Sequence, residues 1–132
     1  MKSIKTKDLT QTTVFKASAD DVYDALMDSQ KHSEFTGGKA VMSQKVGGKF
    51  TAYDGYIEGT NTELKPGKKI IQSWRATDWP KGHFSKVTYT LTKKGGKTEL
   101  KFKQEGVPAD QYDAIKQGWV DYYWEPLKKM FK

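Results

Sequence analysis

Polar and apolar residues alternate through most of the segment from residue 39 to residue 105. The alternation is clearest over residues 86–92 and 99–103, where every second side chain is apolar. Successive side chains of a strand point to opposite faces, so this period of two predicts strands with one buried and one wet face. Turn sequences separate the strands: Gly47-Gly48, Asp54-Gly55, Pro66-Gly67, Pro80–Gly82 and Gly95-Gly96. Because the connections are short, we expect six strands here, paired as antiparallel hairpins.

A further strand and two short helices are predicted ahead of this region. The segment from Thr10 to Ala17 is rich in Thr, Val and Phe, as β-strands are. Ser18 precedes two acidic residues and a run with helical spacing, which is typical of a capped helix N-terminus. The segment from Ser29 to Phe35 predicts a second short helix that ends at Gly37-Gly38.

One long amphipathic helix is predicted from Val107-Pro108 to the C-terminus. Its acidic residues lie early and its lysines late, as the helix dipole favours, whereas Pro126 predicts a kink in the last turns. The apolar arc is wider than one sheet face requires, because Trp124 and Phe131 extend it at the margin. The additional width calls for a second contact surface: a strongly curved sheet, an enclosed pocket or another protein.

The order of these elements predicts a single α+β domain over residues 1–132, with residues 1–8 as a flexible N-terminal extension. Aromatic residues make up 13% of the chain, which argues against disorder. There is no Cys, no secretory signal and no apolar run of the roughly 20 residues that a membrane span needs. We therefore expect a cytoplasmic protein without disulfides.

The formal net charge of +7 favours an anionic partner. Most of the cations are single lysines near predicted turns and strand edges, where lysine discourages aggregation between strands. The chain also carries no motif typical of nucleic-acid-binding domains. Nucleic acid is therefore not an expected partner, and that hypothesis would require the lysines to gather on one face.

Candidates for catalysis are few. His32 and His83 are the only histidines, and neither has a second metal ligand at a recognisable spacing. His83 lies in a loop between two strands and is interpreted as a hydrogen-bonding residue of that loop. The strand faces expected to point inward are almost entirely apolar. The sequence therefore predicts no enzyme, no metal site and no cofactor.

A ligand cavity between the sheet and the long helix is one possible site. Large aromatic rings are expected to face inward there: Phe35, Phe50, Trp74, Tyr89, Phe102, Trp119 and Tyr123. The alternative is that these rings fill the core, where burial of each contributes about 2–3 kcal/mol. A filled interior or a small cavity is slightly favoured, and the Tyr hydroxyls would make any cavity partly polar.

A partner-binding surface is the other possible site. Trp79 and His83 lie in a loop that contains Pro and Gly, and Trp124 and Phe131 lie on the margin of the long helix. Trp is a favoured anchor of protein interfaces, and neighbouring lysines would complement an acidic partner. The alternative, of equal weight, is that Trp124 and Phe131 seal the edge of the sheet.

Several blocks of the sequence resemble a known superfamily and, within it, one family. Three blocks are similar to the helix-grip superfamily, which includes START and Bet v 1-like domains: Phe35–Ala40, Gly47–Phe50 and Asp54–Gly59. Four more resemble the C-terminal domain of the activators of the ninety-kilodalton heat-shock chaperone ATPase: Ile71–Arg75, Trp79–Ser85, Gln104–Pro108 and Gln117–Tyr123. The resemblance covers nearly the whole chain.

The resemblance implies a helix-grip fold, in which a curved antiparallel sheet of six or seven strands holds the long helix across its concave face beside two short helices. It also implies a co-chaperone of the stress response that binds the heat-shock protein 90 chaperone. Full activators carry an additional N-terminal domain, for which this sequence has too few residues. The alternative implied by the superfamily is a carrier or sensor of a small hydrophobic ligand.

Overall fold

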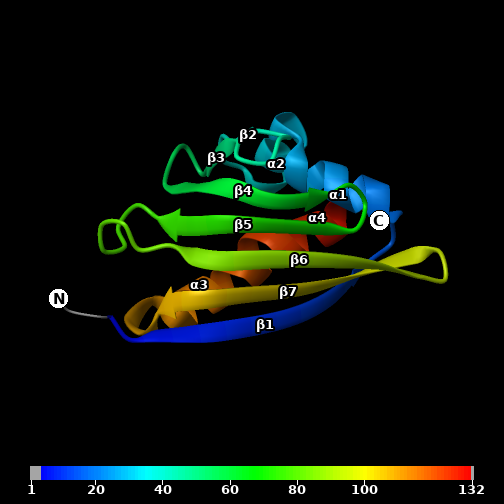
Figure 1. Cartoon of the computed structure of the whole chain (residues 1–132). Coiled ribbons are helices and arrows are strands. Elements are labelled where there is room, and N and C mark those ends of the chain that lie inside the picture. The colour runs from blue at the N-terminus through cyan, green and yellow to red at the C-terminus, as the bar shows by residue number, and fades with distance from the viewer. Residues whose placement is uncertain (1–3, 132) are drawn as a thin grey trace.

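The computed structural model describes residues 4–131, which form one seven-stranded antiparallel sheet and a set of helices (Figure 1). The strands are β1 (Thr6–Phe15), β2 (Val41–Met42), β3 (Lys49–Ala52), β4 (Ile57–Lys65), β5 (Lys69–Ala76), β6 (Ser85–Lys94) and β7 (Lys97–Pro108). The helices are α1 (Ala19–Met27), α2 (Ser29–Thr36), η1 (Ala109–Gln111), α3 (Tyr112–Trp119), η2 (Val120–Trp124) and α4 (Glu125–Met130). The predicted α+β class and the number of strands are confirmed.

The sheet follows the predicted alternation. Its strand order is β1-β7-β6-β5-β4-β3-β2, and every neighbouring pair is antiparallel. On β6, Val87, Tyr89 and Leu91 are buried, and they lie opposite buried residues of β7 such as Phe102 and Leu100. One face of the sheet therefore carries the core and the other faces solvent.

The two short helices begin and end where the sequence predicts. The Ser18 hydroxyl accepts a hydrogen bond from the Asp21 backbone N–H at 3.1 Å and caps α1. Asp28 caps α2 in the same way, through the backbone N–H of Lys31. Gly37 ends α2 in the left-handed conformation, with a φ of 79°, which glycine adopts without steric cost.

The sheet curves around the C-terminal helical run, which lies on its inner face (Figure 1). β1 and β3 are five steps apart in the strand order, so a flat sheet would hold them about 24 Å apart. Yet Gln11 of β1 contacts Trp124, and Tyr53, which directly follows β3, packs on Tyr122. Both parts of the sheet reach one helical run only about 10–12 Å wide, so the sheet must bend.

Two predicted boundaries are corrected. β1 already begins at Thr6, so residues 6–8 belong to the sheet rather than to a flexible extension, and residues 1–3 lie outside the described residues. The predicted start of the long helix at Val107-Pro108 is also wrong, because both residues still pair with β1. The pairing of these residues with the edge strand outweighs the preference of Pro for a first helical turn.

Candidate functional site

The C-terminal helical run owes its shape to Pro126. Proline has no N–H to donate, and its ring collides with the carbonyl four residues earlier in a regular α-helix. The five residues of η2 directly ahead of it form a π-helical segment, whose wider turn accommodates the proline. The interruption predicted from Pro126 thus takes the form of a π segment, and it places both Tyr123 and Trp124 in the core while Tyr122 stays 55% exposed.

Trp119 lies at the centre of an aromatic cluster that joins the helix to the sheet. Its ring centroid lies 4.3 Å from that of Phe102, 4.5 Å from that of Tyr123 and 5.5 Å from that of Trp74. Trp74 and Phe102 belong to β5 and β7, so the cluster spans the middle of the sheet. These rings fix the height of the helix above the sheet.

A chain of buried hydrogen bonds runs beneath this cluster. The Trp119 indole N–H donates to Gln104 Oε1 at 2.7 Å, and the Gln104 amide donates to Ser85 Oγ at 3.0 Å. Ser85 in turn donates to the carbonyl of Trp74 at 2.8 Å. The expectation of an almost entirely apolar interior is therefore wrong at these positions, and each polar group is buried with a partner, as burial requires.

His32 connects the short helices to the C-terminal run. Its Nδ1 lies 2.9 Å from the carbonyl oxygen of Leu26, which can only accept, so Nδ1 carries the proton. Its Nε2 lies 2.8 Å from the Tyr123 hydroxyl and accepts from it in the neutral ring. Burial lowers the pKa of His32, although the Leu26 carbonyl acts in the opposite direction. The imidazole is therefore held neutral at the end of the cluster.

This burial predicts a loss of stability on acidification. The unfolded chain protonates His32 near pH 6.5, whereas the folded chain does so only at lower pH, so protons favour the unfolded state in between. The free energy of unfolding should therefore fall as the pH drops from about 7.5 to about 5.5. Denaturant unfolding of the wild type and of His32→Gln checks this: the variant should show the shallower dependence, and parallel curves would contradict it.

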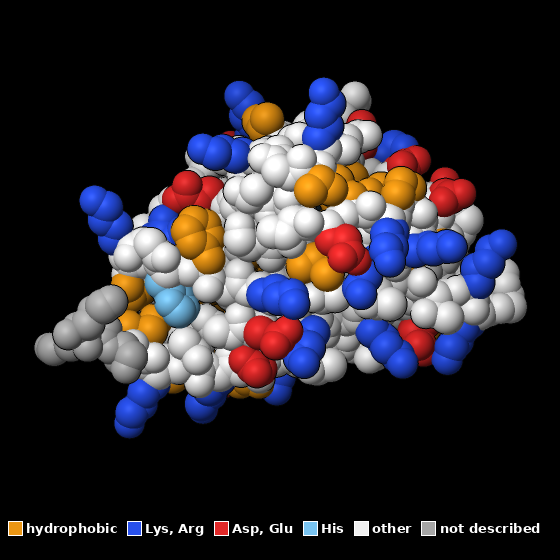
Figure 2. All heavy atoms as spheres, viewed as in Figure 1, with side chains coloured by type: hydrophobic (Ala, Val, Ile, Leu, Met, Phe, Trp, Pro, Cys, Tyr) orange, Lys and Arg blue, Asp and Glu red, His pale blue; other side chains and the backbone are white. Residues whose placement is uncertain are grey.

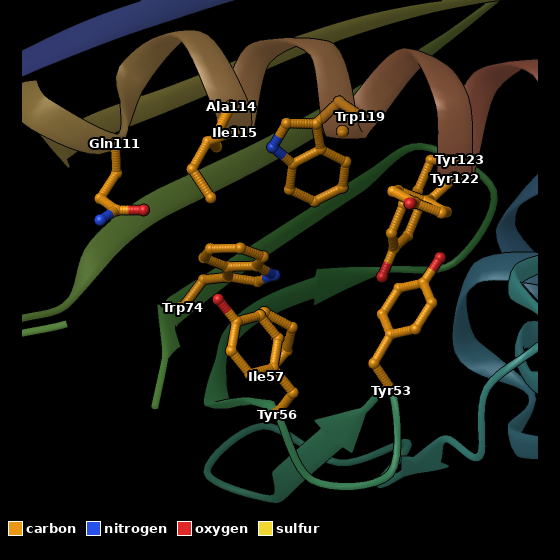
Figure 3. Close-up of a pocket in the computed structure, with 11 residues that line it drawn as sticks. Tyr53, Tyr56, Ile57, Trp74, Gln111, Ala114, Ile115, Trp119, Tyr122 and Tyr123 are labelled. Carbon is orange, nitrogen blue, oxygen red and sulfur yellow. The ribbon is translucent and has the colours of Figure 1, made fainter. Parts of the chain in front are cut away.

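An open apolar pocket lies between the C-terminal helical run and the turn that joins β3 to β4 (Figure 3). Its volume is about 410 Å³. The lining residues are Tyr53, Tyr56, Ile57, Trp74, Gln111, Ala114, Ile115, Gly118, Trp119, Tyr122 and Tyr123. A cavity of this size is within the range of small-molecule sites.

The seven residues predicted to face a cavity lie in three different environments: the open pocket, a closed void and the filled core. Trp74, Trp119 and Tyr123 line the pocket. Phe50 and Tyr89 instead border a closed void that has no room for a water molecule. Phe35 packs on Tyr123 and Phe102 on Trp119, so these two rings fill the core. For these four rings, the structure matches the filled interior that was the alternative.

The mouth of the pocket was not predictable from the sequence pattern. Tyr53 and Tyr56 flank the Asp54-Gly55 turn, in which Tyr53 and Asp54 both adopt left-handed backbone conformations with φ of 50° and 56°. This strained turn places both rings at the pocket, and the Tyr56 hydroxyl donates to Asp78 at 2.9 Å. The turn sequence marks a hairpin, but nothing in it shows that the two Tyr rings reach a helix far along the chain.

The predicted partner surface is largely wrong. Trp79 and Trp124 are each only 4% exposed. Trp79 packs on Trp74, and the Trp124 indole N–H donates to Gln11 of β1 at 2.6 Å. The curved sheet thereby covers the margin of the helix that was expected to face a partner.

The other two residues of that predicted surface are partly buried. His83 lies with its Nε2 2.7 Å from the carbonyl of Gly106, as expected of a loop hydrogen-bonding residue. Phe131 packs on Phe15 of β1, with a centroid distance of 6.4 Å. Phe131 therefore helps to seal the sheet edge, which was the alternative to a docking role.

Two other kinds of site find no support within residues 4–131. No group of three or more His, Asp or Glu side chains is arranged to hold a metal ion there. No helix among these residues is both long and apolar enough to cross a membrane.

Comparisons with known proteins identify relatives of this chain. It is 36% identical to the human "Activator of 90 kDa heat shock protein ATPase homolog 1" over 128 residues, which are 97% of this chain and 38% of that protein. A relative from Dictyostelium discoideum, "Activator of 90 kDa heat shock protein ATPase homolog", is 35% identical over 96% of this chain and 33% of its own length. The chain thus spans well under half the length of these curated relatives.

Solved structures agree with the sequence comparisons. The crystal structure of an HSP90 activator from Plasmodium falciparum superposes with a TM-score of 0.89 at 25% identity, covering 93% of this chain and 94% of that one. The sequence model of the family described as "Activator of Hsp90 ATPase homolog 1-like protein" matches residues 16–132. These findings confirm the predicted resemblance and the helix-grip fold: the chain belongs to the family of Activator of Hsp90 ATPase homolog 1-like proteins.

Proposed function

We propose that this chain is a co-chaperone domain that binds a chaperone of the Hsp90 class. The observation that carries the proposal is the family match over residues 16–132, together with 36% identity to a human activator along 97% of the chain. The fold adds support, because the TM-score to an HSP90 activator is 0.89. Since Trp79 and Trp124 are buried, the docking surface has to come from other residues.

The outer face of the sheet offers such a surface. Phe84, directly before β6, is 46% exposed, and Lys86, two residues later on β6, is exposed on the outer face of the sheet. Figure 2 shows that Lys and Arg side chains are spread over this side of the molecule among Asp and Glu. With a net charge of +7, such a surface attracts an acidic partner and raises the rate of association.

A double variant tests this surface. Phe84→Ala with Lys86→Glu removes one exposed apolar anchor and reverses one charge, so we expect binding to a purified Hsp90-class chaperone to weaken about tenfold. Any stimulation of chaperone ATP turnover by the wild type should fall with it. Fluorescence anisotropy of the labelled chain measures the affinity.

A matched control is available near the edge of the sheet formed by β2. Val46 is 62% exposed beside the exposed Lys45, in the loop between β2 and β3. Val46→Ala with Lys45→Glu changes the same kinds of groups and should leave the affinity unchanged. Equal weakening in both double variants would show that the sheet face at Phe84 is not the docking surface.

A second candidate function is the binding of a small hydrophobic molecule. The observation that favours it is the open pocket of about 410 Å³ with an almost entirely aromatic and aliphatic lining. Titration with a small neutral aromatic hydrocarbon tests it, followed by the Trp fluorescence to which Trp74 and Trp119 contribute. A saturable change supports the function, and an unchanged signal up to the solubility limit of the hydrocarbon contradicts it.

A further inference from the structure

The wall of the pocket is built mainly from the rings of six aromatic residues. Tyr53 and Tyr56 come from the β3–β4 turn, Trp74 comes from β5, and the other three rings belong to the C-terminal helical run (Figure 3). The faces of aromatic rings carry partial negative charge, which attracts cations, and Trp and Tyr attract them most strongly. Neither Lys nor Arg is among the lining residues.

One carboxylate is joined to this wall by a hydrogen bond, although the chain as a whole is basic. Asp54 lies between the two Tyr residues of the turn, Asp78 accepts from the Tyr56 hydroxyl, and Asp121 directly precedes Tyr122. The helical segment over residues 109–125 contains four carboxylates and one Lys: Asp110, Asp113, Asp121, Glu125 and Lys116. The carboxylate of Asp78 on the Tyr56 hydroxyl therefore places negative charge beside the wall, which favours a positive ligand against the net charge of +7.

The cation nearest to the wall in sequence is already paired. Arg75 follows Trp74, and its guanidinium lies 2.7 Å from a carboxylate oxygen of Glu58. It therefore adds no net positive charge beside the pocket. The carboxylate of Asp78, which is bound to the Tyr56 hydroxyl, is then the charge joined to the pocket wall.

Gly118 keeps the helix side of the pocket open. Glycine inside a helix is less stable than alanine, so a residue of this type needs a reason. Packing does not supply one, because an added Cβ would meet only Tyr122 Cδ2, at 3.9 Å. A side chain at this position would instead occupy space beside Ala114 and Trp119 on the pocket wall.

We propose that this pocket binds a hydrophobic ammonium ion: an organic cation whose charged head lies against the Tyr and Trp faces and whose apolar body contacts Ile57 and Ile115. The proposal rests on the second candidate function and names the chemical class of its ligand. An anion of the same shape is disfavoured by the ring faces and by the neighbouring carboxylates.

Three probes of nearly the same shape but different charge show whether the charge of a ligand determines its affinity for the pocket. Benzyltrimethylammonium carries a positive charge, neopentylbenzene is its neutral counterpart, and benzylsulfonate is an anion with a tetrahedral head. We expect the cation to bind about tenfold more tightly than the neutral probe, and the anion more weakly than both, in a Trp fluorescence titration. Equal binding of cation and neutral probe, or preferred binding of the anion, overturns the inference but leaves the pocket as a hydrophobic site. Binding of none of the probes overturns both.

Substitutions in the chain test whether the cation binds in this pocket. Gly118→Leu fills the open side of the pocket and should abolish binding of the cation. Circular dichroism checks that this variant is folded. Unchanged binding would show that the cation binds elsewhere and would overturn the inference. Asp54→Asn with Asp78→Asn should weaken binding of the cation several-fold and leave binding of the neutral probe unchanged. Asp24→Asn, on the exposed face of α1, is the matched control and should change neither. Equal loss for cation and neutral probe in the double variant would also contradict the role of the carboxylates.

Discussion

Replacing Trp119 by alanine is expected to lower the free energy of unfolding by about 3–5 kcal/mol through the cavity alone. The ring packs on Phe102, Tyr123 and Trp74, so few neighbours are free to collapse into the space. The same change leaves the buried amide of Gln104 without its partner, which adds about 1–3 kcal/mol. A domain of this kind has about 5–15 kcal/mol in total, so the variant should be close to unfolding.

Denaturant unfolding followed by circular dichroism measures the effect. Trp119→Phe is the companion variant for the case in which the alanine variant does not fold. It keeps one aromatic ring but removes the indole N–H and the smaller ring that carries it, so it should cost at least about 1–3 kcal/mol. Tyr122→Ala, on the same helical run but 55% exposed, is the control and should cost clearly less, about 1 kcal/mol, because it loses only the packing of its ring on Tyr53. A Trp119→Phe variant as stable as the wild type would contradict the role of the buried hydrogen-bond chain.

Gly59→Ala is expected to cost about 3 kcal/mol or more, at the upper end of what overpacking causes. Gly59 lies on β4 between Phe50 of β3 and Trp74 of β5. An added Cβ would overlap the backbone carbonyl oxygen of Ser73 and would lie 2.7 Å from two carbon atoms of the Phe50 ring. The ring could turn aside, but the carbonyl cannot move without opening the β4–β5 ladder.

The same substitution at Gly118 is the matched control. It lies in the middle of a helical run with no atom closer than 3.9 Å to the added Cβ, so Gly118→Ala should stabilise the chain by about 0.5–1 kcal/mol. Thermal unfolding of the two variants beside the wild type should therefore show shifts of opposite sign. A Gly59→Ala variant as stable as the wild type would show that the strands there are not closely packed.

The strands and short helices were predictable because local chemistry determines them. The alternation on β6 and β7 survives in the structure as a buried and a solvent-facing side. Ser18 acts as a cap through its own hydroxyl, three residues from its partner, and Gly37 ends α2 by its own backbone freedom. Each of these features depends on residues close together in the sequence.

The exposure of the aromatic residues was not predictable in the same way. Trp124 is covered because its indole reaches Gln11, 113 residues earlier in the chain, and Trp79 is covered by Trp74 through the fold of a loop. The helical pattern shows that Trp124 lies at the margin of the apolar arc, but only the curvature of the sheet decides what covers it. This residue also belongs to the π segment ahead of Pro126, which the helical pattern does not predict.

The residues that line the pocket were also only partly predictable from the sequence. Trp74 and Trp119 were identified from their inward-facing positions, whereas Tyr53 and Tyr56 lie in a turn where the period of two no longer applies. The buried Gln104 was likewise hidden, because an amide on an inward face is explained only by the indole N–H that it meets. Long-range partners of this kind leave no periodic signal in a sequence.

Isothermal titration of this chain into an Hsp90-class chaperone tests the proposed co-chaperone role. We expect saturable binding with a dissociation constant below about 50 µM, because the family match covers most of the chain. An absence of binding heat at that concentration, for a chain that circular dichroism shows to be folded, would contradict the proposed co-chaperone role.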